Sequence, residues 1–260
     1  MSEKQNVHRG RNDYSYALLI VSAVLGPALR VPGFAKLWVF HLALVLYACK
    51  MLLGAMRKRR LSLQQGTLPY MLFFMKWYIW ICGSYFWAES LRYYFQYLVI
   101  YTIMFSFLWM VIGKNRDIQS LMGSMRLLCS LHIIVIVMGI VEILTDFRMM
   151  RSGVKIMGHG IPTVCFSNPN DFATYLVLAS SFLLAMVLFS GRRNVRIRMF
   201  CLLMATLLVM FFTSSRANYL AFAIVLFSSM ILLVLRRGRE FKNIFIYGGL
   251  SMILAWFAIG

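Results

Sequence analysis

The sequence predicts an all-α membrane protein, a polytopic bundle of transmembrane helices. Of its 260 residues, 61% are hydrophobic and only 13% are charged, whereas soluble domains are about half apolar and about a quarter charged. Apolar runs of roughly 17–25 residues recur along the chain, and each is long enough to cross a hydrocarbon core of about 30 Å. Backbone polar groups inside lipid need internal partners, so we expect these runs to be helices.

We predict nine spans within a single transmembrane domain that covers residues 1–260. The first span is interpreted as retained in the protein, because no small-residue cleavage site follows it as in a signal peptide. The seventh span is short, so we expect it to begin nearer Val195. The predicted ranges are 14–29, 34–54, 68–87, 93–112, 121–144, 172–190, 199–212, 218–235 and 244–260.

Basic residues alternate with the spans and predict the orientation. They gather at the N-terminus and after spans two, four, six and eight, for example at 57–60, at 192–198 and at 236–242. Basic loops stay in the cytoplasm, so the N-terminus is predicted to be cytoplasmic and the protein to lie in the plasma membrane. The net charge of +19 is thus interpreted as a topology signal and as contact with anionic membrane lipids, not as nucleic-acid binding.

Cations on the opposite, outer face are scarce, and the topology does not explain them. Arg216 lies in FFTSSRANYL, residues 211–220, between two apolar runs. Its guanidinium is suited to phosphate or pyrophosphate, and Thr213, Ser214 and Ser215 add hydroxyl groups at the start of the next helix. The alternative is an arginine that reaches lipid head groups from a helix end. The other outer-face cations include Arg30, Arg92, Arg148, Arg151 and Lys155.

A second polar segment is FSNPNDFATYL, residues 166–176, at the end of a predicted external loop of about 145–171. Pro169 keeps Asn168 out of the helical region, and we expect Asn170 or Asp171 to cap a helix that begins near Phe172. Such a helix N-terminus favours anions, and the Asn168 and Asn170 amides are expected to face the outer mouth of the bundle. The alternative is an ordinary junction between a loop and a helix.

These two segments, with SYFWAESLRYYFQYL at residues 84–98, resemble the O-antigen ligase / O-antigen polymerase family of bacterial membrane proteins. The resemblance covers roughly residues 75–235. It implies a membrane glycosyltransferase that takes sugars from undecaprenyl pyrophosphate on the outer face, without a metal or another cofactor. Arg216 matches the motif arginine of the family, and residues 168–170 match its NPN-like segment.

The resemblance, together with the outer-face cations and the one histidine of the external loop, gives expected roles for individual residues and partners. Arg216 would be catalytic, and His159 is the candidate base, although it lies in an earlier loop than the histidine of the family. The expected partners are an undecaprenyl-pyrophosphate-linked glycan, membrane lipids and polysaccharide assembly proteins. Because the later external loop of the family is not matched, we expect a truncated relative that binds the donor without transferring its sugar. The expected donor-binding residues are Arg92, Arg148, Arg151, Asn168, Asn170 and Ser215.

The remaining residues bear on other sites and functions. The five cysteines form no CxxC pair and no cluster with histidine, so no metal site is predicted. Glu89, Glu142 and Asp171 are further outer-face carboxylates that could accept a proton. A transporter or flippase of a lipid-linked oligosaccharide or a small anion would also need outer-facing cations, but Lys76 is the one charge near the middle of a predicted span. A non-catalytic assembly subunit is the third possibility.

Overall fold

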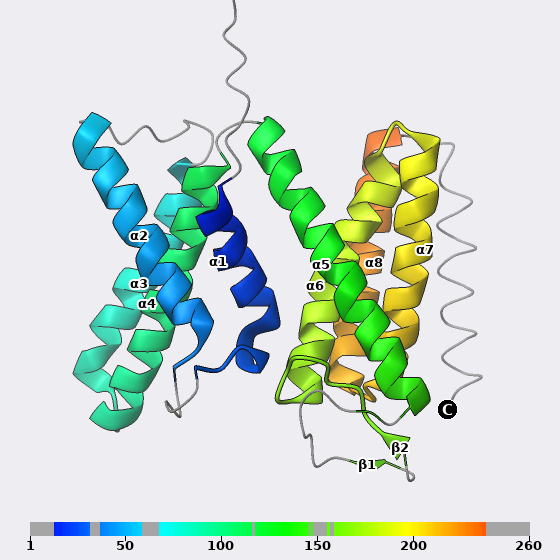
Figure 1. Ribbon diagram of the computed structural model, residues 1–260, viewed down its shortest axis with the longest axis horizontal. Coiled ribbons are helices and arrows are strands. Elements are labelled where there is room, and N and C mark those ends of the chain that lie inside the picture. The colour runs from blue at the N-terminus through cyan, green and yellow to red at the C-terminus, as the bar shows by residue number, and fades with distance from the viewer. Residues whose placement is uncertain are drawn as a thin grey trace, which may run out of the picture. The chain divides into compact units, whose positions relative to one another are not determined.

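The computed structural model is helical and describes residues 13–31, 37–58, 68–115, 118–145, 147, 155–156 and 159–237. Two short strands, β1 (Lys155–Ile156) and β2 (His159–Gly160), pair in antiparallel fashion in the long loop after α5. Short 3-10 helices extend α1 at Gly26–Ala28 and α3 at Ser84–Trp87. The described α-helices (Figure 1) are α1 (Tyr14–Leu25), α2 (Val39–Lys58), α3 (Leu68–Gly83), α4 (Leu91–Lys114), α5 (Ile118–Thr145), α6 (Pro169–Phe189), α7 (Arg193–Phe212) and α8 (Arg216–Arg237).

The prediction of a helical protein with apolar helices of membrane-spanning length is confirmed. Eight of the nine predicted spans fall on these helices, and the ninth, 244–260, lies outside the described residues. Among the described residues, five helices are long and apolar enough to cross a membrane, namely α2, α4, α5, α6 and α7. The count of nine spans, the cytoplasmic N-terminus and the single domain stay predictions.

Several predicted boundaries were wrong by up to six residues. The helix α7 begins at Arg193, which is earlier than the predicted 199 and close to Val195. The helix α6 begins at Pro169 instead of Phe172. Both helices start with polar residues, which hydropathy places outside a span although their backbone is already helical.

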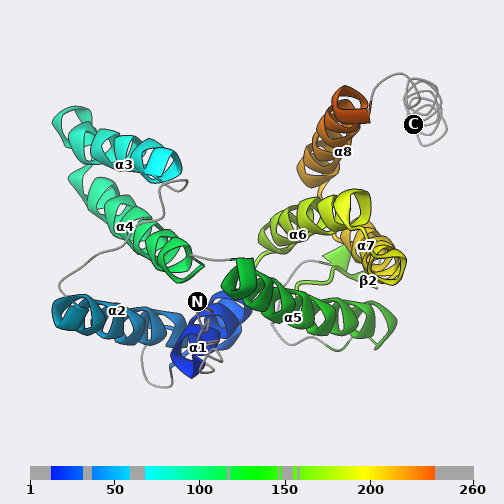
Figure 2. The ribbon, with the colours of Figure 1, turned by 90° about the horizontal axis from the view of Figure 1, so that it is seen from above.

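The contacts within the chain form two units, unit 1 (Met1–Leu131) and unit 2 (His132–Gly260). In unit 1, α1 packs against α2 and α3 packs against α4 (Figure 2). In unit 2, α6 packs against both α7 and α8. Leu183 and Leu184 of α6 and Leu203 of α7 form a buried cluster there, which Phe222 and Val225 of α8 partly cover.

A polar network joins the helices of unit 1 at one end. The Asp13 carboxylate caps α1 by accepting from the backbone N–H of Tyr16 at 3.3 Å, and it forms ion pairs with Lys50 of α2 and with Lys114 of α4. Partial burial raises the pKa of Asp13, but these bonds and the Lys114 charge outweigh it and lower the pKa to about 2. The network therefore holds an ionised carboxylate at the start of α1.

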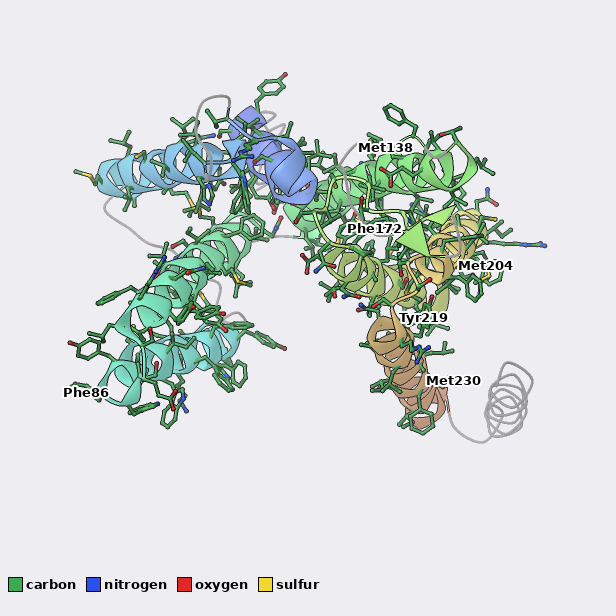
Figure 3. The ribbon with its side chains drawn as sticks, turned by 90° about the horizontal axis from the view of Figure 1, so that it is seen from below. Phe86, Met138, Phe172, Met204, Tyr219 and Met230 are labelled. Atoms are coloured by element: carbon green, nitrogen blue, oxygen red, sulfur yellow. The ribbon has the colours of Figure 1, made fainter. Side chains whose placement is uncertain are left out.

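Among the described residues, most of the fully buried side chains lie in unit 2. Phe172 and Leu176 of α6 and Val209 of α7 are fully buried, whereas Phe86 in unit 1 is 85% exposed (Figure 3). A Cβ at Gly139 of α5 would lie 2.9 Å from Val209 Cγ1 and 3.6 Å from Phe172 Cζ. Gly139 therefore allows α5 to approach α6 and α7 closely, as small residues often do between membrane helices.

Candidate functional site

The first part of the site is the N-terminus of α6. Asn168 is the N-cap, with an extended backbone and a side chain that accepts from the Asn170 N–H at 2.8 Å. Pro169 follows as the first helical residue, where its fixed φ fits and its missing N–H costs nothing. The prediction that Asn170 or Asp171 caps this helix was therefore wrong. Pro169, which keeps Asn168 extended, is itself the first helical residue, so the cap lies two residues earlier than Asn170.

The second part is the turn between α7 and α8. Thr213 ends α7 and its hydroxyl donates to the Met210 carbonyl at 2.6 Å. Ser214 has a left-handed backbone with φ of 54°, which reverses the chain before α8 begins at Arg216. Thr213 and Ser215 are buried, whereas Ser214 and Arg216 are exposed. Of the three predicted hydroxyl donors, the Thr213 hydroxyl is thus already used by its own helix.

The two predicted segments meet in the structure. The Ser215 hydroxyl donates to Asn170 Oδ1 at 2.9 Å. Asn218 Nδ2 donates to Ser215 Oγ at 2.8 Å and to the Asn170 carbonyl at 3.3 Å. The Thr174 hydroxyl lies 2.9 Å from the Asn170 carbonyl and 3.2 Å from Asn218 Oδ1, and it shares its one proton between these two acceptors. Side-chain hydrogen bonds therefore join the first turns of α6 and α8, although their residues lie more than forty positions apart.

Asn218 and Thr174 were missed by the sequence reasoning. Their signal is the helical spacing: Asn218 follows Ser215 by three residues and Thr174 follows Asn170 by four, so each pair shares one face of its helix. An asparagine and a threonine on the same faces as two motif residues, inside otherwise apolar helices, would have indicated a contact between those faces.

Arg216 is presented to the surroundings at this junction. It is exposed, and no hydrogen bond or ion pair joins it to the part of the chain that the structure describes. Asp171, in the first turn of α6, is exposed as well. Arg192 and Arg193 lie at the opposite end of α6, which is about 30 Å long from its 21 residues. The exposed cation and the basic turn therefore occupy opposite ends of these helices.

A buried histidine connects three helices of unit 2 and was also missed. His132 of α5 is 4% exposed. Its Nε2 lies 2.9 Å from Thr206 Oγ1 of α7, and its Nδ1 lies 3.1 Å from the Tyr175 hydroxyl of α6. Because Thr206 Oγ1 donates its own proton to the Leu202 carbonyl at 2.7 Å, it accepts from Nε2–H. This arrangement fits a neutral imidazole that holds the three helices in register.

Glu142 has a structural position in unit 2 and does not line an open surface. It is 2% exposed, and its Oε2 accepts from the backbone N–H groups of Thr163 at 2.8 Å and Val164 at 2.9 Å. The loop 161–165 is buried with it, and burial raises the pKa of the Cys165 thiol to about 12. The expectation that Glu142 is an available base was therefore wrong, because its carboxylate fixes the loop that leads to Asn168.

The structure gives fewer contacts for the other predicted site residues, and two of them lie outside the described part of the chain. Arg92 is exposed at the second position of α4, in unit 1. His159 lies in β2, with its backbone paired to Ile156, and Arg148 and Arg151 lie outside the described residues. The roles of these four residues stay predictions. Within the described ranges, no group of three His, Cys, Asp or Glu side chains is arranged to hold a metal ion.

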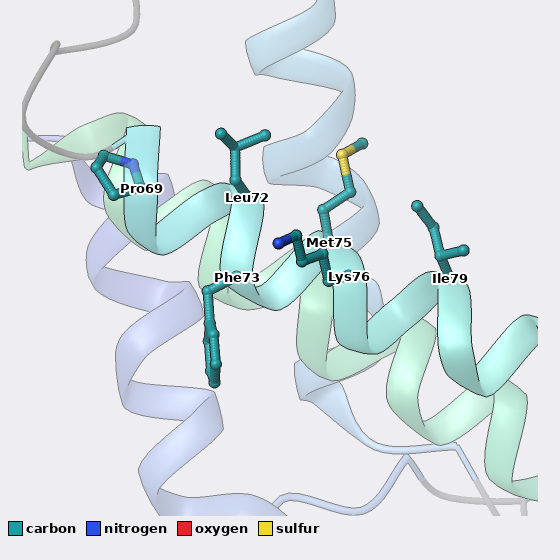
Figure 4. A pocket seen from close by; sticks show the side chains of 6 residues that line it. All are labelled: Pro69, Leu72, Phe73, Met75, Lys76 and Ile79. Atoms are coloured by element: carbon teal, nitrogen blue, oxygen red, sulfur yellow. The ribbon is translucent and has the colours of Figure 1, made fainter.

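A hollow of about 330 Å³ lies along α3 in unit 1 (Figure 4). Lys76 is the charged residue of its lining and is exposed, with no ion-pair partner among the described residues. All residues of the lining belong to one helix, namely Pro69, Leu72, Phe73, Met75, Lys76 and Ile79.

The sequence of the chain is similar to that of a bacterial biosynthesis protein. It is 26% identical over 195 residues to the teichuronic acid biosynthesis protein TuaE of Bacillus subtilis (strain 168). The aligned part covers 72% of this chain and 40% of that relative. No protein-family model matches the chain, and no solved structure matches it significantly.

Proposed function

We propose that this chain is a membrane glycosyltransferase-like protein of cell-surface polysaccharide synthesis. It takes its sugar from an undecaprenyl-pyrophosphate-linked donor, as the resemblance to O-antigen ligases and polymerases implies. The similarity to a teichuronic acid biosynthesis protein supports the class of pathway. The observation that carries the proposal is the Ser215–Asn170 hydrogen bond, which holds the exposed Arg216 beside the N-terminus of α6.

The reaction needs positive charge where the leaving group departs. An acceptor hydroxyl attacks the anomeric carbon of the donor sugar, a new C–O bond forms, and the bond to the pyrophosphate oxygen breaks with its electron pair. Arg216 donates two N–H groups to the departing pyrophosphate, and the N-termini of α6 and α8 add their dipoles. A base takes the proton of the acceptor hydroxyl, and His159 is the candidate from the sequence.

The proposal places this chemistry on the outer face of the bacterial plasma membrane. The proposal includes three predictions from the sequence: nine spans, a cytoplasmic N-terminus and contact with membrane lipids. The arrangement of unit 2 supports it, because the basic turn at Arg192 and Arg193 lies at the opposite end of α6 and α7 from Arg216. With that turn in the cytoplasm, Arg216 faces outward, where lipid-linked sugars are expected to be used.

The test compares substitutions of Arg216 in the 260-residue chain, purified and placed in lipid nanodiscs. One charge-assisted hydrogen bond to a phosphate is worth about 1.5–3 kcal/mol. Arg216→Ala is therefore expected to weaken binding of an undecaprenyl-pyrophosphate-linked oligosaccharide by roughly 10–150-fold. Arg216→Lys should retain an intermediate affinity, because lysine keeps the charge but not the fork of donors.

The matched control is Arg193→Ala, which removes another exposed arginine, from the first position of α7. It should bind the donor as the unchanged protein does. If Arg216→Ala also binds normally, Arg216 only contacts lipid head groups and the proposed function is wrong. Sugar transfer is measured separately, with the same donor and a free acceptor glycan.

A further inference from the structure

Asn218 contacts three groups at the junction of α6 and α8. Its side chain is buried. Nδ2 donates to the Asn170 carbonyl and to Ser215 Oγ, and Oδ1 lies 3.2 Å from Thr174 Oγ1, whose proton is shared with the Asn170 carbonyl. No residue of this kind was expected from the two motifs. Its position in the first turn of α8 places it between Ser215 and α6.

These bonds constrain the orientation of the two side-chain amides in the junction. The Asn170 carbonyl can only accept, so the end of Asn218 that faces it must be the NH₂ group. Its second N–H then occupies a lone pair of the Ser215 hydroxyl. The Ser215 hydroxyl donates its single proton to Asn170, and the accepting atom, at 2.9 Å, is Oδ1. The chain of bonds thus has one polarity, and it begins at a backbone carbonyl.

The consequence concerns the other end of the Asn170 carboxamide. With Oδ1 bonded to Ser215, the Nδ2 group is the end of the Asn170 carboxamide that is left for another partner. Asn170 is exposed, and its Nδ2 has no hydrogen-bond partner among the described residues. Two N–H donors are therefore presented on the exposed side of the junction, next to the helix end that Arg216 begins.

We infer that Asn218, acting through Ser215, orients the Asn170 amide so that its N–H donors bind a pyrophosphate oxygen of the donor beside Arg216. This inference rests on the proposed function and deepens it. Asn170 is the binding residue, and Asn218 and Ser215 are positioning residues. An amide in the opposite orientation would present Oδ1 instead, and a carbonyl oxygen repels a phosphate oxygen.

The competing explanation is that Asn170 only latches α6 to α8. Asn170→Asp separates the two, because a carboxylate still accepts from Ser215 but presents an anionic oxygen in place of the N–H donors. Asn170→Ala loses both the latch and the donors. We expect the affinity for undecaprenyl pyrophosphate, measured in nanodiscs, to fall roughly 10-fold in Asn170→Ala and further in Asn170→Asp. A latch alone predicts the reverse order, with Asn170→Asp closer to the unchanged protein.

The added charge of Asn170→Asp needs its own control. Ser167→Asp places the same charge on the exposed segment just before α6, three residues from Asn170. It leaves the Ser215–Asn170 bond intact and should weaken binding less than Asn170→Asp. An equal loss in the two variants would show that charge repulsion alone explains the effect, and it would overturn the inference.

The positioning role of Asn218 is tested with a double-mutant cycle. Asn218→Leu keeps the approximate shape and removes the hydrogen bonds, so alone it should weaken donor binding. In an Asn170→Ala background it should have no further effect on the dissociation constant, because the group that it orients is already absent. Additive losses would mean that Asn218 acts on binding by another route. Unfolding temperatures of all variants show whether each remains folded.

The outcomes also separate this inference from the proposed function. If Arg216→Ala leaves binding of undecaprenyl pyrophosphate unchanged, the proposed function fails. If Arg216→Ala weakens binding and Asn170→Asp does not, the proposed function stands and the inference on Asn170 and Asn218 is wrong.

Discussion

At the scale of single residues, polar side chains in unit 2 bond mainly to backbone groups. Asn168 caps α6, Thr213 caps α7 and Glu142 receives two N–H groups of a buried loop. The sequence predicted that Asn168 and Arg216 matter, because an X-Pro step and a cation on the outer side are local signals. It could not predict the position of Glu142, since the loop that it holds begins about twenty residues further on.

Glu142 is predicted to be a structural residue. Glu142→Ala leaves the N–H groups of Thr163 and Val164 buried without their acceptor, and each such group costs about 1–3 kcal/mol. The unfolding temperature in detergent should therefore fall clearly, whereas Glu142→Gln, which keeps one acceptor oxygen, should fall less. A Glu142→Ala protein as stable as the unchanged one would contradict this structural role.

Asp13 is predicted to make unit 1 sensitive to acid. Its folded pKa of about 2 lies below its ordinary value of 3.8, so its stabilisation is complete above about pH 4 and is lost as the pH falls towards about 2. The Asp13→Asn variant should be less stable at pH 7 by about 1–2 kcal/mol. Its unfolding temperature should also fall less steeply than that of the unchanged protein between these two pH values. Parallel acid profiles of the two proteins would contradict the assignment.

At the scale of elements, hydropathy predicted where the helices lie, because lipid forces apolar runs of sufficient length into helices. It placed their ends less well, since caps and polar first turns, such as 169–171 and 193–196, carry no hydropathy signal. Hydropathy could not predict which helices pack against each other. The pairing of α6 with α8 depends on Asn170, Ser215 and Asn218, and the approach of α5 depends on Gly139, none of which a single span reveals.

Gly139 is predicted to set the distance between α5 and its neighbours. In Gly139→Ala the new methyl group would lie 2.9 Å from Val209 Cγ1, and overpacking of this kind typically costs about 1–3 kcal/mol. The gain in helix propensity, about 1 kcal/mol, offsets only part of that cost. The unfolding temperature should therefore fall.

The control for Gly139 lies on the same helix. A Cβ at Gly123 would meet nothing within 4 Å, so Gly123→Ala should gain the propensity term and leave the stability unchanged or slightly raised. Equal effects of the two substitutions would show that Gly139 is not a packing position.

At the scale of the whole molecule, the function depends on which end of α6 and α8 faces outward. The structure places Asn168 and Arg216 at one end of these helices and Arg193 at the other. The distribution of basic residues assigns the Arg193 end to the cytoplasm. Neither observation alone is sufficient, because the contacts give relative directions and the charges give sidedness. Together they predict that the exposed cation and the donor lie on the same side of the membrane.

Thiol labelling in intact cells tests this orientation. The five native cysteines, Cys49, Cys82, Cys129, Cys165 and Cys201, are first replaced, and single cysteines are then introduced by Ser167→Cys, Lys155→Cys, Asn194→Cys and Arg59→Cys. A membrane-impermeant maleimide should label the cysteines at 167 and 155 before lysis, and those at 59 and 194 only after the membrane is opened. Ser167 and Asn194 are both exposed, so the side of the membrane that each cysteine faces, and not its burial, decides whether it is labelled. If the cysteine at 194 is labelled in intact cells and that at 167 is protected, Arg216 faces the cytoplasm. A donor site on the outer face would then be impossible, whatever Arg216 binds.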